Sequence, residues 1–274
     1  AVTAVPAPEA DYLSVLLIGS DLSGNLADVI MLAVIPDDGT EPMLVSLPRD
    51  LYLPNRCTQS FTKINANLAG CRNGVDINGP TLLALAVEDF TGFPIDHFAL
   101  FDFEGFESII DEVGGVEICL TYAVRDSRSD LDLPAGCTTA TGAEALAWVR
   151  SRHTQEYVQG RWRTMPGVSD LTRNQRQQEM ILAMIEKARS FGSPNDLTAK
   201  VASLTDFFTF DDQLGLSQAI SIAWGLRDVQ LEKVYRLEIP VKNHRTNQGA
   251  AVLIPVTSFN ELIEEFYPKV LIPS

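Results

Sequence analysis

Three apolar runs near the start of the chain predict three neighbouring strands. They cover residues 14–18, 29–35 and 43–47, and each is rich in aliphatic side chains and bounded by turn-forming residues. The PDDGTEP segment between the second and third runs is a strong turn signal. We therefore expect the three strands to form an antiparallel meander.

This topology predicts that three polar residues converge. In such a meander, the end of the first strand, the start of the second and the end of the third lie on the same edge of the sheet. Asp21, Asp28 and Arg49 occupy these three ends. The alternative is that each aspartate is an ordinary turn residue whose side chain satisfies the nearby backbone.

The remainder of the chain alternates helical and extended patterns. Helical spacing predicts helices over residues 81–90, 106–113, 142–149, 170–189, 214–227 and 258–266, and strands over 97–103, 116–120 and 234–239. Alternating strands and helices around one sheet are typical of an α/β layered fold. No repeat or internal linker separates a second domain, so we expect one domain over residues 13–274, preceded by a linker over residues 1–12.

Composition excludes several classes of protein. The 274 residues are 46% hydrophobic and 21% charged, which is an ordinary globular composition. The 36 acidic and 21 basic residues give a formal charge of -15, which argues against a nucleic-acid binder and against docking on anionic lipid headgroups. The longest apolar run, over residues 29–35, is far shorter than the roughly 20 residues of a membrane-spanning helix. Because the sequence begins at Ala1, we expect that an anchor or signal lay upstream.

The four cysteines suggest two local disulfides. Cys57 with Cys71, and Cys119 with Cys137, would each close a short loop of polar sequence, and disulfides imply an extracytoplasmic location. Four buried free thiols are the alternative. No CxxC pair is present and the three histidines are scattered, so a zinc site is not expected.

Arginines are concentrated in one short segment. Six of them lie within 27 positions: Arg150, Arg152, Arg161, Arg163, Arg173 and Arg176. Arginine is the side chain best suited to bind phosphate with two parallel hydrogen bonds, so this segment predicts an anion site in an acidic protein. A solvated charged loop is the alternative interpretation.

Helical spacing arranges part of this cluster. Asp170, Arg173 and Gln177 lie at i, i+3 and i+7 on one helix face, which Arg176 flanks. Ser169 or Asp170 can cap the start of this helix, so its anion-favouring end lies close to the same face. Arg150 and Arg152 share a side only if the chain becomes extended after residue 149.

Two aspartates together with several arginines fit phosphoryl or diphosphate chemistry. Carboxylates can hold Mg²⁺, and the metal and arginines can neutralise the transferring phosphoryl group. The sequence contains no GxxxxGK[ST], GxSxG or HExxH motif. His153 follows the arginine pair and is the one histidine with a conceivable site role, whereas His97 begins an apolar strand and reads as structural.

These motifs together resemble the LytR-CpsA-Psr family of cell-wall glycopolymer transferases. Eight segments occur in family order between residues 13 and 188: LLIGSD (16–21), ADVIMLAVI (27–35), SLPRDLYL (46–53), KINA (63–66), TGFPIDHF (91–98), FDFEGFESIIDEVGGVEIC (101–119), GAEALAWVRSRH (142–153) and SDLTRNQRQQ (169–178). The cysteine usage and the DLPAGC segment look most like actinobacterial members.

The resemblance implies a fold, a location and an activity. It implies a single-domain α/β/α layered fold around a central mixed sheet, with an apolar pocket for a polyprenyl chain and an arginine-lined mouth that holds its diphosphate with Mg²⁺. Members face outside the cytoplasm on an N-terminal membrane anchor, which this sequence does not contain. They move a glycopolymer from polyprenyl diphosphate to peptidoglycan and leave a phosphodiester, and several also act as pyrophosphatases.

Site residues are carried over position by position. Asp21 and Asp28 match the metal-binding aspartates. Eight further residues match the catalytic or diphosphate-contacting positions: Arg49, Lys63, Arg150, Arg152, Asp170, Arg173, Arg176 and Gln177. Asp170 would act either as general base or by orienting Arg173, and we favour orientation. Asp50 would support the site or be structural.

The chain departs from the family pattern in one place. Leu26 stands where many members carry an arginine two residues before the second aspartate, and Leu22 and Ser23 follow Asp21 where an arginine is usual. One phosphate contact would then be either missing or supplied elsewhere, for example by Arg161 or Arg163. Two other functions remain open, a hydrolase of prenyl or nucleotide diphosphates and a non-catalytic carrier of polyprenyl lipids.

Overall fold

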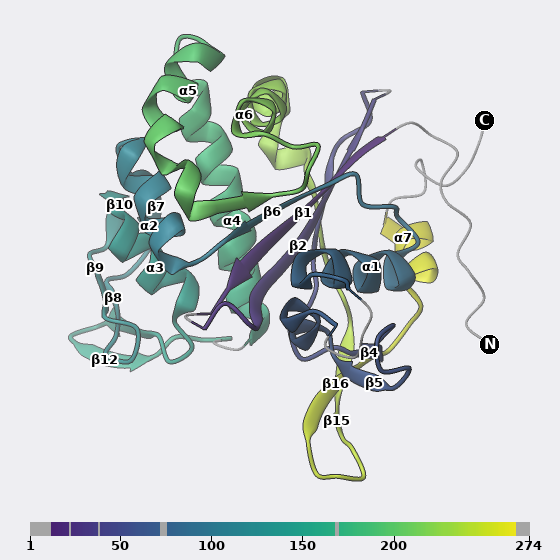
Figure 1. Ribbon diagram of the computed structural model, residues 1–274. Coiled ribbons are helices and arrows are strands. Elements are labelled where there is room, and N and C mark those ends of the chain that lie inside the picture. The colour runs from purple at the N-terminus through teal and green to yellow at the C-terminus, as the bar shows by residue number, and fades with distance from the viewer. Residues whose placement is uncertain (1–11, 22, 38, 72–75, 168–169, 267–274) are drawn as a thin grey trace. The chain divides into compact units, whose positions relative to one another are not determined.

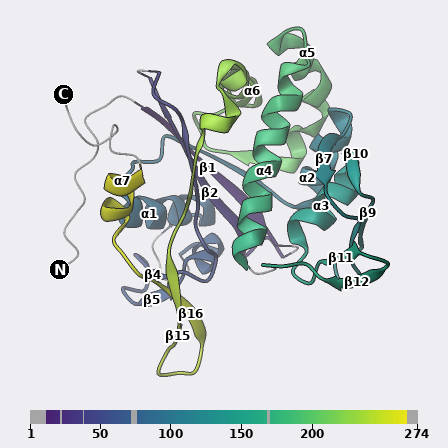
Figure 2. The same ribbon diagram turned by 180° about the vertical axis from the view of Figure 1, so that it is seen from behind.

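The computed structural model describes residues 12–21, 23–37, 39–71, 76–167 and 170–266 (Figures 1 and 2). The chain divides into two compact units. Unit 1 takes its residues from Ala1–Asp102, Phe210–Leu214 and Val229–Ser274, and unit 2 from Phe103–Thr209 and Gly215–Asp228. The linker expected over residues 1–12 lies outside the described residues except for its last position, and the expected domain over residues 13–274 stays a prediction.

A mixed six-stranded sheet contains the strands of unit 1 that were expected from the apolar runs. In spatial order its members are β13 (Phe208–Phe210), β6 (His97–Phe101), β1 (Tyr12–Ser20), β2 (Ala27–Pro36), β3 (Met43–Ser46) and β14 (Tyr235–Glu238). The pairs β1–β2 and β2–β3 are antiparallel, which is the predicted meander. The pairs β1–β6 and β3–β14 are parallel. The expected α/β fold with a central mixed sheet is therefore confirmed.

Alternation along these strands builds the core of unit 1. Ile18 lies opposite Ile30, and Leu32 lies opposite both Leu16 and Val45, so all five side chains share one face of the sheet, and all are buried. Fully burying an aliphatic side chain of this size stabilises the fold by roughly 1.5–3 kcal/mol.

Two α-helices and a short 3-10 helix pack on that face. They are α1 (Gly79–Thr91), α7 (Phe259–Phe266) and η1 (Ile64–Ala69), and Figure 1 shows α7 beside α1. Asn78 caps the start of α1, and Gly92 ends it in the left-handed conformation with φ 77°. The apolar residues of α1 lie in this core.

Two hairpins complete unit 1. The first pairs β4 (Tyr52–Pro54) with β5 (Phe61–Lys63), and the second pairs β15 (Val241–Arg245) with β16 (Ala251–Pro255). The second hairpin extends away from the sheet in both views (Figures 1 and 2). Sequence periodicity predicted neither hairpin.

Unit 2 is built from helices and two small antiparallel sheets. Its helices are α2 (Phe103–Glu112), α3 (Gly142–Arg150), α4 (Asp170–Arg189), α5 (Pro194–Val201) and α6 (Leu216–Gly225). Helix α3 packs on α2 and α4, and α6 packs on α4 and α5. One sheet pairs β7 (Val116–Leu120) with β10 (Gly136–Ala140). The other has the order β12 (Arg161–Thr164), β11 (Gln155–Val158), β8 (Val124–Asp126) and β9 (Leu131–Leu133).

Short 3-10 helices connect the later elements. They are η2 (Ala202–Phe207), η3 (Leu226–Asp228) and η4 (Leu231–Lys233). No helix among the described residues has both the length and the apolar character needed to span a bilayer.

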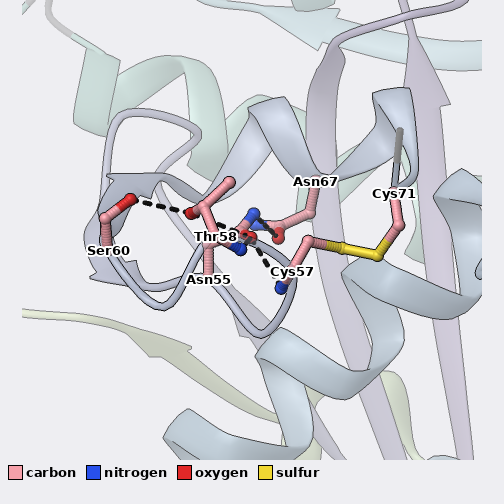
Figure 3. The surroundings of a disulfide bond; sticks show 6 residues. All are labelled: Asn55, Cys57, Thr58, Ser60, Asn67 and Cys71. Atoms are coloured by element: carbon pink, nitrogen blue, oxygen red, sulfur yellow. Dashed lines mark hydrogen bonds between the residues drawn. A yellow bond between two sulfur atoms is a disulfide. The ribbon is translucent and has the colours of Figure 1, made fainter. Parts of the chain in front are cut away.

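The structure joins the four cysteines in the two expected disulfides, one in each unit. Cys57 bonds to Cys71, with 5.6 Å between their Cα atoms, beside the buried pair Asn55 and Asn67 (Figure 3). The Asn55 amide donates to Asn67 Oδ1 at 2.8 Å, and Asn55 Oδ1 accepts the backbone N–H of Cys57 at 2.9 Å. Cys119 and Cys137 lie directly opposite each other in β7 and β10.

Candidate functional site

The predicted strand edge of unit 1 carries Asp21, Asp28 and Arg49. Asp21 follows the last residue of β1, Asp28 is the second residue of β2, and Arg49 lies three residues beyond the end of β3. The register brings Ser20 opposite Ala27, and Leu47 donates its backbone N–H to the Ile30 carbonyl at 2.9 Å. The ends of three consecutive strands therefore meet at one edge of the sheet, as the meander predicted.

Asp21 organises the turn between β1 and β2. Its Oδ1 accepts a hydrogen bond from the Ser23 hydroxyl at 2.8 Å and weaker ones from the backbone N–H groups of Leu26 and Asn25 at 3.2 and 3.3 Å. Partial burial raises the pKa of Asp21, but these hydrogen bonds outweigh it and hold the pKa below its ordinary value. The side chain is thus a stable carboxylate that also serves as a turn residue, so the two interpretations made from the sequence are compatible.

Asp28 and Arg49 belong to a chain of ion pairs. Arg49 Nη1 donates to Asp28 Oδ1, and Arg49 Nε lies 3.8 Å from Asp50 Oδ2. Lys63 Nζ donates to the other oxygen of Asp50 at 2.6 Å. All four side chains are roughly one-quarter to one-third exposed, so they are fixed by their neighbours and still open to solvent. Asp50 therefore links two of the predicted phosphate-binding cations.

Backbone hydrogen bonds from distant segments hold the Arg49–Asp50 dipeptide. Asn65 in η1 donates its N–H to the Arg49 carbonyl at 3.2 Å, and Leu253 in β16 donates to the Asp50 carbonyl at 2.9 Å. The turn that presents Arg49 is thereby tied to two elements that packing, and not local sequence, brings close.

The two aspartates have the chemistry of a hard-metal site. Among the described residues, Asp28 Oδ2 accepts no hydrogen bond, and Asp21 Oδ2 accepts only that of Ser23, at 3.0 Å. Each carboxylate thus retains an oxygen for a cation, and Mg²⁺ commonly uses one or two carboxylates together with substrate phosphates. One three-residue cluster of possible ligands, Glu117 with Cys119 and Cys137, also occurs in the described chain, but its sulfurs are bonded to each other.

Arg150 and Arg152 flank the end of α3 in unit 2. Arg150 is the last residue of the helix, and its guanidinium lies 4.3 Å from the centre of the Phe103 ring. The helix continues one residue beyond its predicted end at residue 149, and the next residue, Ser151, has an extended backbone with φ -63° and ψ 127°. Both arginines are exposed.

Arg176 has a different role from the one expected. We placed it beside the phosphate-binding face of α4, but the structure buries it at 4% exposure. Its Nη1 donates to the Thr154 hydroxyl at 2.9 Å and to the Ser151 carbonyl at 3.2 Å. Burial lowers the pKa of Arg176 to about 10, against the opposing charges of Glu179 and Asp126, so it remains a cation near neutral pH. The physical reason is that α4 packs on α3, which turns this side chain inward.

Asp126 completes this buried network and was not singled out from the sequence. Its Oδ2 accepts the Ser151 hydroxyl at 2.7 Å and the His153 N–H at 2.9 Å. Burial raises the pKa of Asp126, but these hydrogen bonds and that from the Arg128 N–H outweigh the effect and lower the pKa overall. The network fixes the segment between Arg150 and His153 from beneath. The only sequence signal for it is an acidic residue at an inward position of a short strand.

Helix α4 carries the remaining predicted residues. It begins at Asp170, so Asp170, Arg173 and Gln177 lie on the expected helix, whereas Ser169 lies outside the described residues. Arg173 is 6% exposed and Gln177 is half-buried.

Three further residues named from the sequence lie outside α4. His153 is exposed and accepts a hydrogen bond from Arg128, and Arg163 pairs with Glu156. Leu26, at the position where an arginine was expected, is 40% exposed.

Comparison with known proteins gives consistent results. A model of the LytR_cpsA_psr family matches residues 2–265. The probable cell wall biosynthesis protein LcpB of Corynebacterium glutamicum is 36% identical over 175 residues, which are 64% of this chain and 37% of that protein. The polyisoprenyl-teichoic acid–peptidoglycan teichoic acid transferase TagT of Bacillus subtilis is 30% identical over 203 residues, which are 68% of this chain and 56% of TagT. The chain thus spans about one-third to just over one-half of these relatives.

A solved structure has the same fold. The crystal structure of TagV from Bacillus subtilis matches with a TM-score of 0.73 at 20% identity and covers 97% of this chain and 100% of TagV. The corynebacterial relative agrees with the actinobacterial character suggested by the cysteines.

Proposed function

The chain belongs to the LytR-CpsA-Psr family, and from this premise we propose that it is an extracytoplasmic phosphotransferase. It would move a glycopolymer from polyprenyl diphosphate to peptidoglycan and form a phosphodiester. The relatives named as cell wall biosynthesis proteins and teichoic acid transferases support this class of reaction. The two disulfides support a location outside the cytoplasm, on the wall side of a membrane to which an upstream anchor would attach it.

The observation that carries the proposal is the ion-paired chain of Asp28, Arg49, Asp50 and Lys63 at the strand edge of unit 1. Arg49 and Lys63 are held by carboxylates but remain open to solvent, so each can give up an ion pair with a carboxylate and bind phosphate oxygens instead. Arg49 offers the planar fork that fits a phosphate, whereas Lys63 acts as a point charge. This arrangement suits a diphosphate better than it suits a neutral ligand.

We propose Asp21 and Asp28 as the residues that would hold Mg²⁺. Bound there, the metal would supply neutralisation of charge on the diphosphate. Arg49 and Lys63 would orient the phosphate oxygens and stabilise the charge that develops on them. The acceptor hydroxyl would form a bond to the sugar-linked phosphorus, while the bond from that phosphorus to the bridging oxygen breaks and polyprenyl phosphate leaves. The hydroxyl proton would pass to solvent or to a nearby carboxylate.

For unit 2, we propose that Arg150, Arg152 and Gln177 contact the phosphate oxygens of the donor, while the buried Arg173 supports Gln177 from the same face of α4. Both arginines are exposed; Arg150 ends α3 and Arg152 lies two residues further on, which favours this role. Asp170 would orient Arg173 through a charge-assisted hydrogen bond. Arg176 would act by holding the segment that carries the first two arginines.

The test is cleavage of geranylgeranyl diphosphate with and without Mg²⁺, followed by product analysis with and without a peptidoglycan acceptor. The parent is compared with Arg49→Ala and Arg152→Ala. Arg56→Ala is the matched control, because Arg56 is an exposed arginine of unit 1 that pairs with Asp89. We expect the parent to turn over the substrate only with Mg²⁺. Arg49→Ala and Arg152→Ala should lower this rate at least a hundredfold, and Arg56→Ala should leave it unchanged. With a prenyl-diphosphate-linked saccharide as donor, release of the saccharide phosphate only to water, even with peptidoglycan present, would indicate a hydrolase. Saturable lipid binding without any turnover would indicate a carrier.

A further inference from the structure

The four-stranded sheet of unit 2 presents a solvent-facing surface that the proposed reaction does not use. Its register places Asp132, Arg125, Gln155 and Thr164 in one row across β9, β8, β11 and β12. Val124 and Glu156, which alternate with them, are buried, so the row points outward. The sheet therefore has one packed face and one open face that carries hydrogen-bonding side chains.

Two aromatic rings lie beside this row. Tyr157 is two residues after Gln155 in β11 and faces Trp162 of β12, with 5.2 Å between the ring centres and 53° between the ring planes. Tyr157 is 45% exposed, which is unusual for so large a ring. Paired Tyr and Trp side chains offer rigid apolar area together with polar tips, and they are enriched at binding surfaces.

Arg125 joins the rings to the polar row. Its guanidinium carbon lies 4.2 Å from the centre of the Trp162 ring, and its Nε donates to the Gln155 side-chain oxygen at 3.0 Å. Within the described residues, no hydrogen bond from its two terminal nitrogens is found, so they are available to an external ligand. The guanidinium is thus already oriented before any ligand binds.

The surface is rigid for its size. The β11–β12 hairpin turns through Gln159 and Gly160, with φ 50° and 82°, which are the left-handed values of a two-residue hairpin turn. On the opposite face, the exposed Arg163 pairs with the buried carboxylate of Glu156 at 2.6 Å. A pre-organised surface loses little conformational entropy on binding.

We propose that this surface, formed by Arg125, Asp132, Gln155, Tyr157 and Trp162, binds a saccharide chain. Sugar rings present C–H groups on their faces, which pack on aromatic rings, and hydroxyl or amide groups at their edges, which need fixed donors and acceptors. The surface supplies the aromatic rings through Tyr157 and Trp162, and it supplies the donors and acceptors through the neighbouring polar row. That the chain is the glycan of the peptidoglycan acceptor rests on the proposed function; that it is a saccharide rests on the surface alone.

Charge on the surface favours a saccharide over a polyanion. Arg125 lies directly opposite Asp132 in the register. A surface for a phosphate polymer would leave such an arginine without an acidic neighbour. The carboxylate of Asp132 would repel phosphates but accept hydrogen bonds from sugar hydroxyls.

Calorimetric titration of the full chain with tetra-N-acetylchitotetraose, without any diphosphate, tests the proposal. We expect saturable binding, with the Kd raised about tenfold or more by Tyr157→Ala and by Trp162→Ala, as for a central aromatic contact. Tyr235→Ala is the matched control, because Tyr235 is 37% exposed on β14 of unit 1, and it should leave the Kd unchanged. Gln155→Ala, which leaves both rings in place, should weaken binding severalfold and guards against a misfolded hairpin.

Several outcomes would overturn the proposal. The first is that the parent does not bind the tetrasaccharide. The second is that all four variants bind it as tightly as the parent does. The third is that the parent binds intact sacculi and binds the sugar-free stem peptide equally well. Because the titration contains no diphosphate, its result is independent of whether the parent protein cleaves geranylgeranyl diphosphate. Failure of the saccharide site and failure of the proposed reaction are therefore distinguishable.

Discussion

The guanidinium carbon of Arg176 lies 3.9 Å from the centre of the Trp148 indole ring, and its Nη1 also donates to the Trp148 carbonyl at 3.4 Å. The same nitrogen reaches the Ser151 carbonyl and the Thr154 hydroxyl. One side chain of α4 therefore holds the last turn of α3 and the four residues beyond it. Arg150 and Arg152 lie within this segment, so a buried arginine fixes the backbone of two exposed ones.

Arg176→Ala should lower the free energy of unfolding by about 3 kcal/mol. The change removes the hydrogen bonds that the charged guanidinium donates, each worth about 1.5–3 kcal/mol, and leaves their buried acceptors without a donor. It also removes a desolvated cation–π contact. Arg176→Lys should recover only part of the loss, since an ammonium cannot reproduce the planar fork. Urea unfolding measures both variants.

A matched control exists within unit 2. Arg227 also lies over a tryptophan, 5.3 Å from the Trp224 ring centre, and donates to its carbonyl at 3.3 Å, but its side chain is 41% exposed. Arg227→Ala should cost less than about 1 kcal/mol because water replaces its contacts. Equal losses for the two alanine variants would contradict the role assigned to burial.

Asp50→Asn should reduce turnover of geranylgeranyl diphosphate by about tenfold or more while changing stability by less than about 1 kcal/mol. The variant weakens the anchoring of Arg49 and Lys63 together, and a small misplacement of a binding group can cost up to about a hundredfold in rate. The stability effect is small because the pairs are partly exposed. Asp89→Asn, which breaks the exposed pair with Arg56, should leave turnover intact. A parent-like rate for Asp50→Asn would exclude the anchoring role.

Removing the Cys57–Cys71 disulfide should destabilise the protein by roughly 3 kcal/mol. The bond closes a loop with a sequence separation of 14, and the chain-entropy model gives about this value for such a loop. The double variant Cys57→Ser, Cys71→Ser should melt at a lower temperature than the parent, and a reducing agent should lower the parent's melting temperature as well. If calorimetry shows equal melting temperatures for parent and double variant, the bond does not stabilise the native state.

The strand edge of unit 1 was predictable because its signals are local. Aliphatic runs specify β1, β2 and β3, one turn motif sets their order, and antiparallel geometry then places Asp21, Asp28 and Arg49 together. The link from Arg49 to Lys63 through Asp50 was not predictable, because it depends on how η1 and β16 pack against the turn.

Tertiary packing also explains the two main differences. Arg173 and Arg176 are three residues apart on α4, and helical spacing alone does not determine which side chain packs toward α3. The β11–β12 hairpin was missed because its two arginines, Arg161 and Arg163, were assigned to the predicted anion site and its strand pattern was not considered. Its alternation becomes apparent only when Tyr157 and Trp162 are seen to face each other.

The stability of the protein should fall in acid partly through Asp126. Its pKa in the folded state is lowered by hydrogen bonds that outweigh burial, so the stability it contributes is present above its unfolded pKa, about 3.9, and is lost as the pH falls through the folded value. Asp126→Asn should be less stable than the parent at pH 7 and should lose less stability between pH 5 and about 2. Urea unfolding at stepped pH measures this difference. Parallel curves for parent and variant would show that Asp126 does not contribute to the acid sensitivity.

Gly142→Ala should destabilise unit 2 by at least about 1–3 kcal/mol, because a Cβ atom at this first position of α3 would lie 2.2 Å from the Glu107 carbonyl oxygen of α2. All three of the nearest atoms belong to the Glu107 backbone, so relief requires the two helices to separate. Gly225→Ala is the control: it lies at the end of α6 with no atom within 4 Å of the added Cβ, and the substitution should be neutral or stabilising by up to about 1 kcal/mol. Thermal unfolding separates these outcomes. A Gly142→Ala protein as stable as the parent would mean that α2 and α3 are not in backbone contact at this point.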